Sequence, residues 1–135
     1  HKAKKHYISS GHHTGKKNNS LNIVESAFGK VEAKLKKNPI MALVQAVENA
    51  APREEVISIE YGGARYPKAV DIAPQRRVDL ALRNMTQGAY WKTFNKKMKI
   101  DDALAEEIMA ASQSSGKSNA IGKKRDLERQ ASSSK

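Results

Sequence analysis

Residues 55–89 constrain the fold most, because they hold two strand-like runs, a Gly-Gly pair and a helical pattern. Residues 56–60 and 66–72 are rich in β-branched and aromatic side chains, which is typical of strands. Gly62-Gly63 lies between them and can supply the positive φ angles of a tight hairpin turn. The sequence therefore predicts a two-stranded β-ribbon over about residues 55–73.

A helix is expected directly after the ribbon. Pro74 suits its first turn, where the N–H that proline lacks would have no partner within the helix. Arg76, Arg77 and Arg83 fall largely off its apolar face and would place cations near the base of the ribbon. The residues predicted to form the buried face recur at helical spacing: Val78, Ala81, Leu82, Met85 and Ala89.

Two helices are expected before the ribbon. Ser20 is the predicted N-cap of the first, and Asn38 caps a second that starts at Pro39. Residues at helical spacing predict the buried stripe of the first helix: Leu21, Val24, Phe28, Val31 and Leu35. The stripe predicted for the second helix is Ile40, Leu43, Val44 and Val47.

Two further helices are expected near the C-terminus. Asp101 is predicted to cap one of them, with a buried stripe of Leu104, Ile108 and Ala111, and with Glu106 and Glu107 facing water. Residues 112–118 are predicted to be a polar linker, and residues 122–131 a short final helix. These patterns predict a mainly α fold, a helical bundle with a protruding two-stranded β-ribbon between helices, and argue against a sandwich, a barrel or a doubly wound sheet.

The charge balance favours a polyanionic partner. The 135 residues include 25 Lys and Arg against 14 Asp and Glu, a formal net charge of +11. There is no cysteine, which excludes disulfides and thiolate metal ligands. No apolar run is long enough to span a bilayer or to form a signal-peptide core, so no membrane partner is expected. Because the chain begins at His1 rather than Met, we expect a segment to precede it.

The chain divides into three expected parts. Residues 1–19 form a basic arm without acidic residues, which we predict to be disordered alone and to order on RNA, because it has little apolar surface. Residues 20–131 form a single helical RNA-binding domain that includes the ribbon, and residues 132–135 a short polar tail.

Catalytic patterns are not found, and we predict that the chain is not an enzyme and needs neither a metal nor a cofactor. All four histidines lie in the arm, at spacings unlike those of a helical zinc pair. Adjacent carboxylates such as Glu106 and Glu107 diverge by about 100° on a helix and cannot easily share a site. Gly62-Gly63 lacks the third glycine and the Lys-Ser/Thr of a phosphate loop.

With catalytic and metal sites rejected, the function that the sequence still supports is binding to a nucleic-acid backbone. Arg76 and Arg77 lie at a helix N-terminus, which already attracts phosphate, although an ion pair to Glu55 or Asp79 would also explain Arg76 and Arg77. For Trp91, which lies among lysines, we favour core packing over stacking on a base. The candidate RNA-binding residues are Lys2, Lys4, Lys5, Lys16, Lys17, Asn18, Arg53, Arg65, Tyr66, Lys68, Arg76, Arg77, Arg83, Lys92, Lys96, Lys97, Lys123, Lys124 and Arg125, with Gly62 and Gly63 as the ribbon turn.

Several motifs, in register along nearly the whole chain, resemble the universal small-subunit ribosomal protein "S-seven" family. They are GKKN at 15–18, NPIMALVQAVENAAPREEV at 38–56, GGARY at 62–66, AVDIAPQRRVDLALR at 69–83 and NAIGKKRDLERQA at 119–131. The amino-acid sequences of these motifs are closer to those of archaeal or eukaryotic members than to those of bacterial ones.

The resemblance implies a structural ribosomal protein that acts in the cytoplasm as a monomer within the ribosome. It implies binding to the 3′ major domain of small-subunit rRNA, organisation of head assembly, a position near exit-site tRNA and mRNA, and contact with a neighbouring small-subunit protein. It also implies an rRNA contact for Lys16, Lys17 and Asn18. The main alternative is a nucleoid-associated DNA-binding protein, in which a ribbon enters the minor groove. A third possibility is a subunit of an RNA-modifying enzyme.

Overall fold

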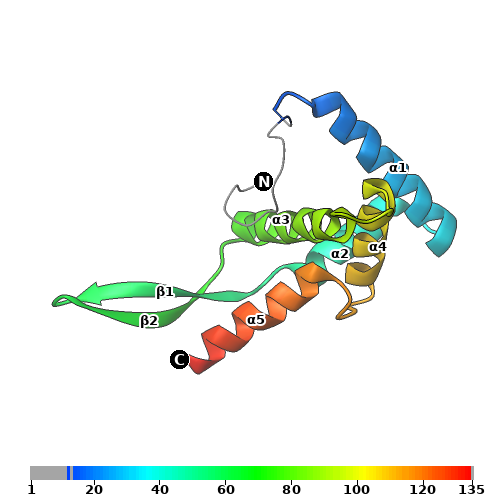
Figure 1. The fold of residues 1–135 in the computed structure, drawn as a ribbon. Helices are drawn as coiled ribbons and strands as arrows, with labels where there is room; N and C mark the ends of the chain where they lie inside the picture. The colour runs from blue at the N-terminus through cyan, green and yellow to red at the C-terminus, as the bar shows by residue number, and fades with distance from the viewer. Residues whose placement is uncertain (1–11, 13, 135) are drawn as a thin grey trace.

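We describe a computed structural model of the chain, in which His12 and residues 14–134 are placed. In chain order the elements are α1 (Lys17–Leu35), α2 (Pro39–Ala50), β1 (Glu54–Tyr61), β2 (Ala64–Asp71), α3 (Pro74–Thr93), α4 (Ile100–Ser112) and α5 (Asn119–Ser133). Figure 1 shows the helices gathered on one side, with the ribbon β1–β2 projecting away from them. The prediction of a mainly α fold with a protruding ribbon is confirmed.

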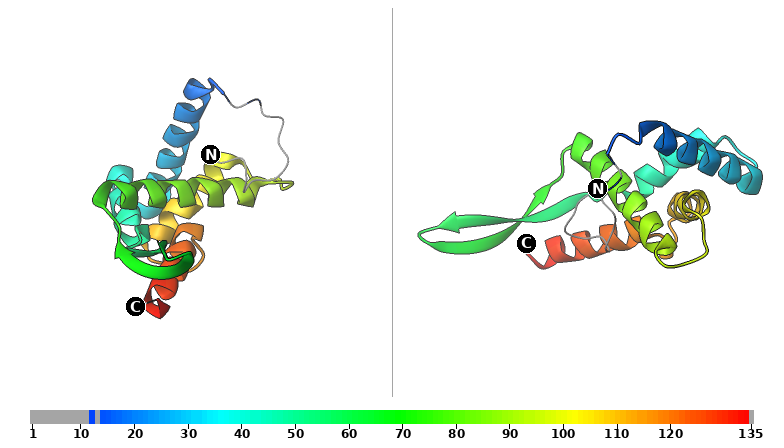
Figure 2. Two further views of the ribbon diagram at one scale, coloured as in Figure 1. Left: turned by 90° about the vertical axis from the view of Figure 1, so that its left-hand side faces the viewer. Right: turned by 45° about the horizontal axis from the view of Figure 1, so that its top comes forward.

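The ribbon is an antiparallel pair closed by a two-residue turn. Its register runs from Glu54 opposite Asp71 to Tyr61 opposite Ala64. Gly62 and Gly63 form the turn with φ angles of 56° and 83°, which is the left-handed conformation that the predicted tight turn requires. α5 packs against β1, so the ribbon and the last helix extend to the same side of the molecule, as the right-hand view of Figure 2 shows.

Helix starts that depend on proline or asparagine follow the prediction. Pro74 occupies the first turn of α3, and Pro39 the first turn of α2. The Asn38 side chain accepts a hydrogen bond of 3.0 Å from the Ile40 N–H, which satisfies one of the otherwise unpaired donors at this end. These signals are local, so they do not depend on what the helix later packs against.

Three predicted helices have wrong boundaries. α1 begins at Lys17 rather than after Ser20, whose Oγ donates a 3.0 Å bond to the Lys16 carbonyl instead of capping. α4 begins at Ile100, so Asp101 lies inside its first turn and is not its cap. α5 begins at Asn119 and runs to Ser133, because Ser118 provides the N-cap; the predicted helix at 122–131 was too short at both ends.

The helices pack mainly through alanine, unlike the predicted stripes of large apolar residues. In α2 the buried residues are Ala42, Ala46 and Ala50, whereas Ile40 and Val44 are more than half exposed, at 60% and 52%. α4 lies between α1, α2 and α3 and packs against all three. Small side chains allow this close approach, and the larger residues on the adjacent face remain at the surface.

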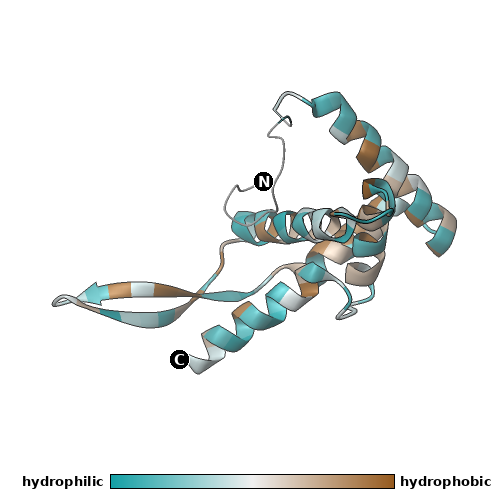
Figure 3. Ribbon diagram, viewed as in Figure 1, coloured by the Kyte–Doolittle hydropathy of each residue, from teal (hydrophilic) through white to brown (hydrophobic). Residues whose placement is uncertain are grey.

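α1 and α3 depart from the predicted stripes in the same way. Leu21 and Val24 are exposed, because the first half of α1 extends beyond the other helices (Figure 1). Val78 and Leu82 of α3 are about 40% exposed, and the polar Asn84 is buried instead. Figure 3 accordingly shows apolar segments in α1 and in the ribbon, away from the packed centre. Predicted residues that do contact the core are Phe28, Val31, Leu35, Leu43, Val47, Ala81, Met85, Ala89, Leu104, Ile108 and Ala111.

Candidate nucleic-acid interface

The ribbon tip exposes two aromatic rings and two cations. Tyr61 is 75% exposed and Tyr66 57% exposed. Side chains alternate between the two faces of a strand, so Tyr66 and Lys68 lie on the same face as Tyr61, and Arg65 lies on the opposite face. The tip therefore offers rings and positive charge on one face, and a separate cation beside Glu60 on the other.

The ribbon base is held by the two arginines of α3. The Arg76 guanidinium donates from Nε to Oε1 of Glu55 at 2.8 Å and from Nη2 to Oε2 at 3.0 Å. This pairing raises the pKa of Arg76 above its ordinary value, mainly through the hydrogen bonds to Glu55. Arg77 donates from Nε to the Pro52 carbonyl at 3.1 Å. The two side chains thus tie α3 to β1 and to Pro52 just before it, and the Arg76–Glu55 pairing predicted as an alternative is present.

Asp79 plays no part in that pairing. It accepts a 3.2 Å hydrogen bond from the side-chain amide of Gln75, one turn earlier in the helix. Arg53 is exposed next to the ribbon base, and its carbonyl accepts a 3.0 Å bond from Ile72 N–H. RNA binding by Arg53, Arg76 and Arg77 stays a prediction.

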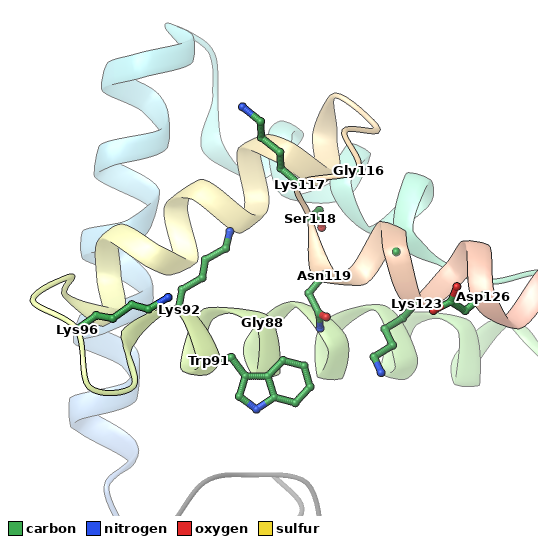
Figure 4. Close-up of a pocket in the computed structure, with 11 residues that line it drawn as sticks. Gly88, Trp91, Lys92, Lys96, Gly116, Lys117, Ser118, Asn119, Lys123 and Asp126 are labelled. Atoms are coloured by element: carbon green, nitrogen blue, oxygen red, sulfur yellow. The ribbon is translucent and has the colours of Figure 1, made fainter.

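A second basic surface lies where the end of α3 meets the start of α5. Here the fold brings together Lys92, Lys96 and Lys123, which are separated along the chain, around a groove of about 560 Å³. Figure 4 shows the Trp91 indole extending from α3, with the Lys123 side chain reaching toward it from α5. The Lys123 ammonium lies 5.9 Å from the ring centroid, within cation–π range. Trp91 is partly buried, so its ring is neither enclosed in the core, as was predicted, nor fully exposed to solvent.

A buried carboxylate bonds to two of the side chains that line this groove. Glu107 of α4 was predicted to face water, but its side chain is fully buried. It accepts hydrogen bonds from Lys92 Nζ at 3.1 Å, Ser118 Oγ at 2.9 Å and the Ala120 N–H at 3.1 Å. These three donors, from α3 and the start of α5, offset the cost of burying the charge. Lys92, predicted to contact RNA, is already paired here.

α3 and α5 approach closely at a glycine. A Cβ atom placed on Gly88 would lie 2.6 Å from Asn119 Cβ and 3.1 Å from the Glu107 carboxyl group. Next to this contact the Asn119 side-chain amide donates a 2.9 Å bond to the Asn84 carbonyl. The absence of a side chain at Gly88 therefore allows the N-terminus of α5 to rest on α3.

The remaining candidates do not gather at one place. Lys124 donates to the Asn49 carbonyl at 2.9 Å and lies 3.9 Å from Glu128, and Arg125 donates to the Ser114 carbonyl at 3.4 Å. The start of α1 lies at a different extremity from the ribbon tip (Figure 1). The other exposed candidates within residues 14–134 are Lys16, Lys17, Asn18, Arg83 and Lys97. Lys2, Lys4 and Lys5 lie outside the described residues.

Two polar residues of the groove, Lys117 and Asn119, were not among the predicted binding residues. Both were assigned to a linker or left unassigned, because the final helix was expected only from residue 122. The missed signal is Ser118, since a serine directly before a helical run is a common N-cap. Recognising it would have placed Asn119 on the first turn of the helix.

The described residues offer neither a metal centre nor a membrane span. No group of three or more His, Asp or Glu side chains among them could hold a metal ion. None of the described helices is long and apolar enough to cross a membrane.

Comparison with known proteins identifies the family. The sequence model of the family described as ribosomal protein S7p/S5e matches residues 2–135. The small ribosomal subunit protein uS7 of Nanoarchaeum equitans is 52% identical over the whole chain, which covers 68% of that protein. The uS7 proteins of Archaeoglobus fulgidus and Picrophilus torridus are 50% and 48% identical over 93% and 90% of the chain, covering 64% and 65% of those proteins.

The chain thus spans about two thirds of the length of these relatives. These relatives come from archaea, which agrees with the resemblance of the motifs to archaeal or eukaryotic family members. A ribosomal-protein family also agrees with the prediction that the chain is not an enzyme. The match over nearly the whole chain confirms the resemblance inferred from the motifs, and the chain belongs to the ribosomal protein S7p/S5e family.

Proposed function

We propose that this chain is a structural protein of the small ribosomal subunit and binds the 3′ major domain of small-subunit rRNA. The observation that carries the proposal is the family match over residues 2–135, with relatives named as small ribosomal subunit proteins. The net charge of +11 supports it, because a protein so basic favours a polyanionic partner. Cations exposed at the ribbon, at the start of α1 and around the α3–α5 groove give several surfaces that an RNA could contact at once.

The finer parts of the proposal concern position in the ribosome. We propose that the chain helps to organise assembly of the subunit head as a monomer in the cytoplasmic ribosome, next to other small-subunit proteins. The ribbon would lie near exit-site tRNA and mRNA. Its length and its exposed Tyr61 and Tyr66 support this, since a ribbon that projects from the helices can reach RNA beyond the main binding surface.

Equilibrium binding tests the proposal. The chain is titrated with a 3′ major domain rRNA fragment at near-physiological salt, in competition with double-stranded DNA and with an unrelated structured RNA of equal length. We expect a strong preference for the rRNA fragment. Equal affinity for all three would mean that charge alone drives binding. That outcome would overturn the proposal and favour the DNA-packaging alternative, against which the family match and the Gly62-Gly63 tip already count.

A further inference from the structure

The α3–α5 groove combines positive charge with an aromatic ring. Its cations are Lys92, Lys96, Lys117 and Lys123, and the one acidic side chain among its described lining residues is Asp126. Two of these charges are already neutralised, since Lys92 pairs with Glu107 and Asp126 pairs with Arg129 at 2.6 Å. The three other lysines form no ion pair within residues 14–134. The groove thus holds an excess of positive charge that the described part of the chain does not neutralise.

The ring at this groove can accept a planar partner. Trp91 lines the groove and is only partly buried, and its indole extends from α3 on the side to which the Lys123 side chain reaches (Figure 4). The Lys123 ammonium lies over the ring, at 5.9 Å from its centroid. Lysine side chains are flexible, so a base could take the place of this ammonium and leave it within reach of the adjoining phosphate.

The walls of the groove are fixed. Glu107 joins α3, α4 and the start of α5 through three hydrogen bonds, and Asn119 bonds to the Asn84 carbonyl of α3. Trp91 and Lys123 are therefore held on two helices that cannot easily separate. A site built on rigid elements loses less conformational entropy when a ligand binds.

We propose that this groove binds one unpaired nucleotide of RNA, with its base stacked on Trp91 and its phosphate held by Lys96, Lys117 and Lys123. The inference rests on the proposed function and deepens it, because it names a single-stranded site in addition to backbone contacts. Single-stranded RNA is the class of ligand that offers an exposed base together with a phosphate. A duplex would offer phosphates but no free base face for the indole.

Trp91 is the only tryptophan of the chain, so its fluorescence reports on this groove alone. Wild-type protein is titrated with a single-stranded hexauridylate and with an abasic ribose-phosphate hexamer that carries the same phosphates. We expect saturable quenching by hexauridylate, and no quenching with weaker binding for the abasic chain. Unchanged emission while hexauridylate binds would overturn the proposal. So would equal quenching by both oligomers, because that would report charge without stacking.

Substitutions give an independent measurement. Trp91→Leu keeps an apolar side chain but removes the stacking face, so the affinity for labelled hexauridylate should fall at least about fivefold. Trp91→Phe should retain most of it. Lys117→Ala should weaken binding, whereas Lys34→Ala, which removes the same charge from the exposed surface of α1, should not. Equal reductions in affinity for the two lysine variants would count against a defined site.

The rRNA fragment separates this inference from the proposed function. If the fragment binds preferentially and Trp91→Leu binds it as tightly as wild type, the groove proposal fails and the ribosomal function stands. If the fragment shows no preference over competitors, the proposed function itself fails. Circular dichroism of Trp91→Leu shows whether the variant is folded, and the wild-type fluorescence titration decides the question if it is not.

Discussion

Lys92 of α3 meets Glu107 of α4 in an ion pair of 3.1 Å, and the carboxylate of that pair is fully buried. The Lys92 side chain is 29% exposed, so the pair connects the surface groove to the interior. The same carboxylate also accepts from Ser118 and from the Ala120 N–H, and so fixes where α5 begins. One carboxylate therefore joins three helices.

Replacing Glu107 should destabilise the whole fold. In Glu107→Ala the Ser118 hydroxyl and the Ala120 N–H lose their acceptor in a buried place, and we expect a loss of about 3 kcal/mol in the free energy of unfolding. Glu107→Gln keeps one acceptor oxygen and the side-chain shape, and should lose about 1 kcal/mol. Urea unfolding measures both. Equal stability of Glu107→Ala and wild type would show that the network contributes nothing.

Two glycine-to-alanine substitutions should have opposite effects. In Gly88→Ala the new methyl group would lie 2.6 Å from Asn119 Cβ, which forces α3 and α5 apart and should cost about 1–3 kcal/mol. Gly122 lies in α5 with nothing within 4 Å of an added Cβ. Gly122→Ala should therefore stabilise the protein by about 0.5–1 kcal/mol, through better helix propensity. Thermal unfolding compares them, and a stabilised Gly88→Ala would contradict the close approach of the two helices.

The features that were predicted correctly from sequence depend on local chemistry. Gly62-Gly63, the Asn38 cap and Pro74 act within one or two turns of their own backbone, so the turn, the start of α2 and the start of α3 follow from them directly. Burial depends on distant partners. Ala42 is buried because α4 packs against α2, and Glu107 is buried because Lys92 and Ser118 lie beside it.

The candidate site likewise has a part that follows from local sequence and a part that depends on contacts between distant residues. Lys92 and Lys96 could be proposed from basic residues among aromatic ones, and Lys123 from the basic run of the final helix. Their convergence on one groove could not be predicted, because it requires α5 to contact α3 at Gly88, and nothing local to either helix specifies that contact. Glu55 as the partner of Arg76 was one of two alternatives, and only the ribbon geometry decides between Glu55 and Asp79.

Acid should weaken the contact between α1 and α4. Hydrogen bonds from Ser26 Oγ at 2.7 Å and Lys30 Nζ at 3.0 Å lower the pKa of Asp101 from 3.8 to about 2. A carboxyl group with a lowered folded-state pKa stabilises the fold above its unfolded pKa, and this contribution is lost as the pH falls from about 4 toward 2. The Asp101→Asn variant should therefore lose less stability than wild type between about pH 5 and pH 2, as measured by the shift in Tm.

Lys30 supplies the positive charge of the contact between α1 and α4, and its effect on stability depends on alkaline pH. The pKa of Lys30 is raised above 10.5, first by its hydrogen bond to Asp102 and then by that to Asp101. The contribution of Lys30 to the stability of the fold is complete below pH 10.5 and is lost as the pH rises through the raised pKa. Identical acid profiles for wild type and Asp101→Asn would show that the ionised Asp101 carboxylate does not contribute to stability.

The final prediction concerns the ribbon base. Arg76→Ala combined with Arg77→Ala should weaken binding to the rRNA fragment and reduce the slope of log affinity against log salt by about 0.7–0.9 for each phosphate that the arginines neutralise in the wild-type complex. α3 itself should survive, because Pro74 and the buried face of the helix are unchanged. Binding isotherms at several salt concentrations, with circular dichroism as a check on folding, give both quantities.

Glu55→Gln is the matched control for that experiment. It removes the charge that neutralises Arg76 but leaves both arginines in place, with their hydrogen-bond donors available to phosphate. If Arg76 binds RNA, this variant should bind the fragment at least as tightly as wild type, since Glu55 no longer competes for the guanidinium. An unchanged affinity and salt slope in the double alanine variant would instead mean that the two arginines serve only to hold α3 against the ribbon.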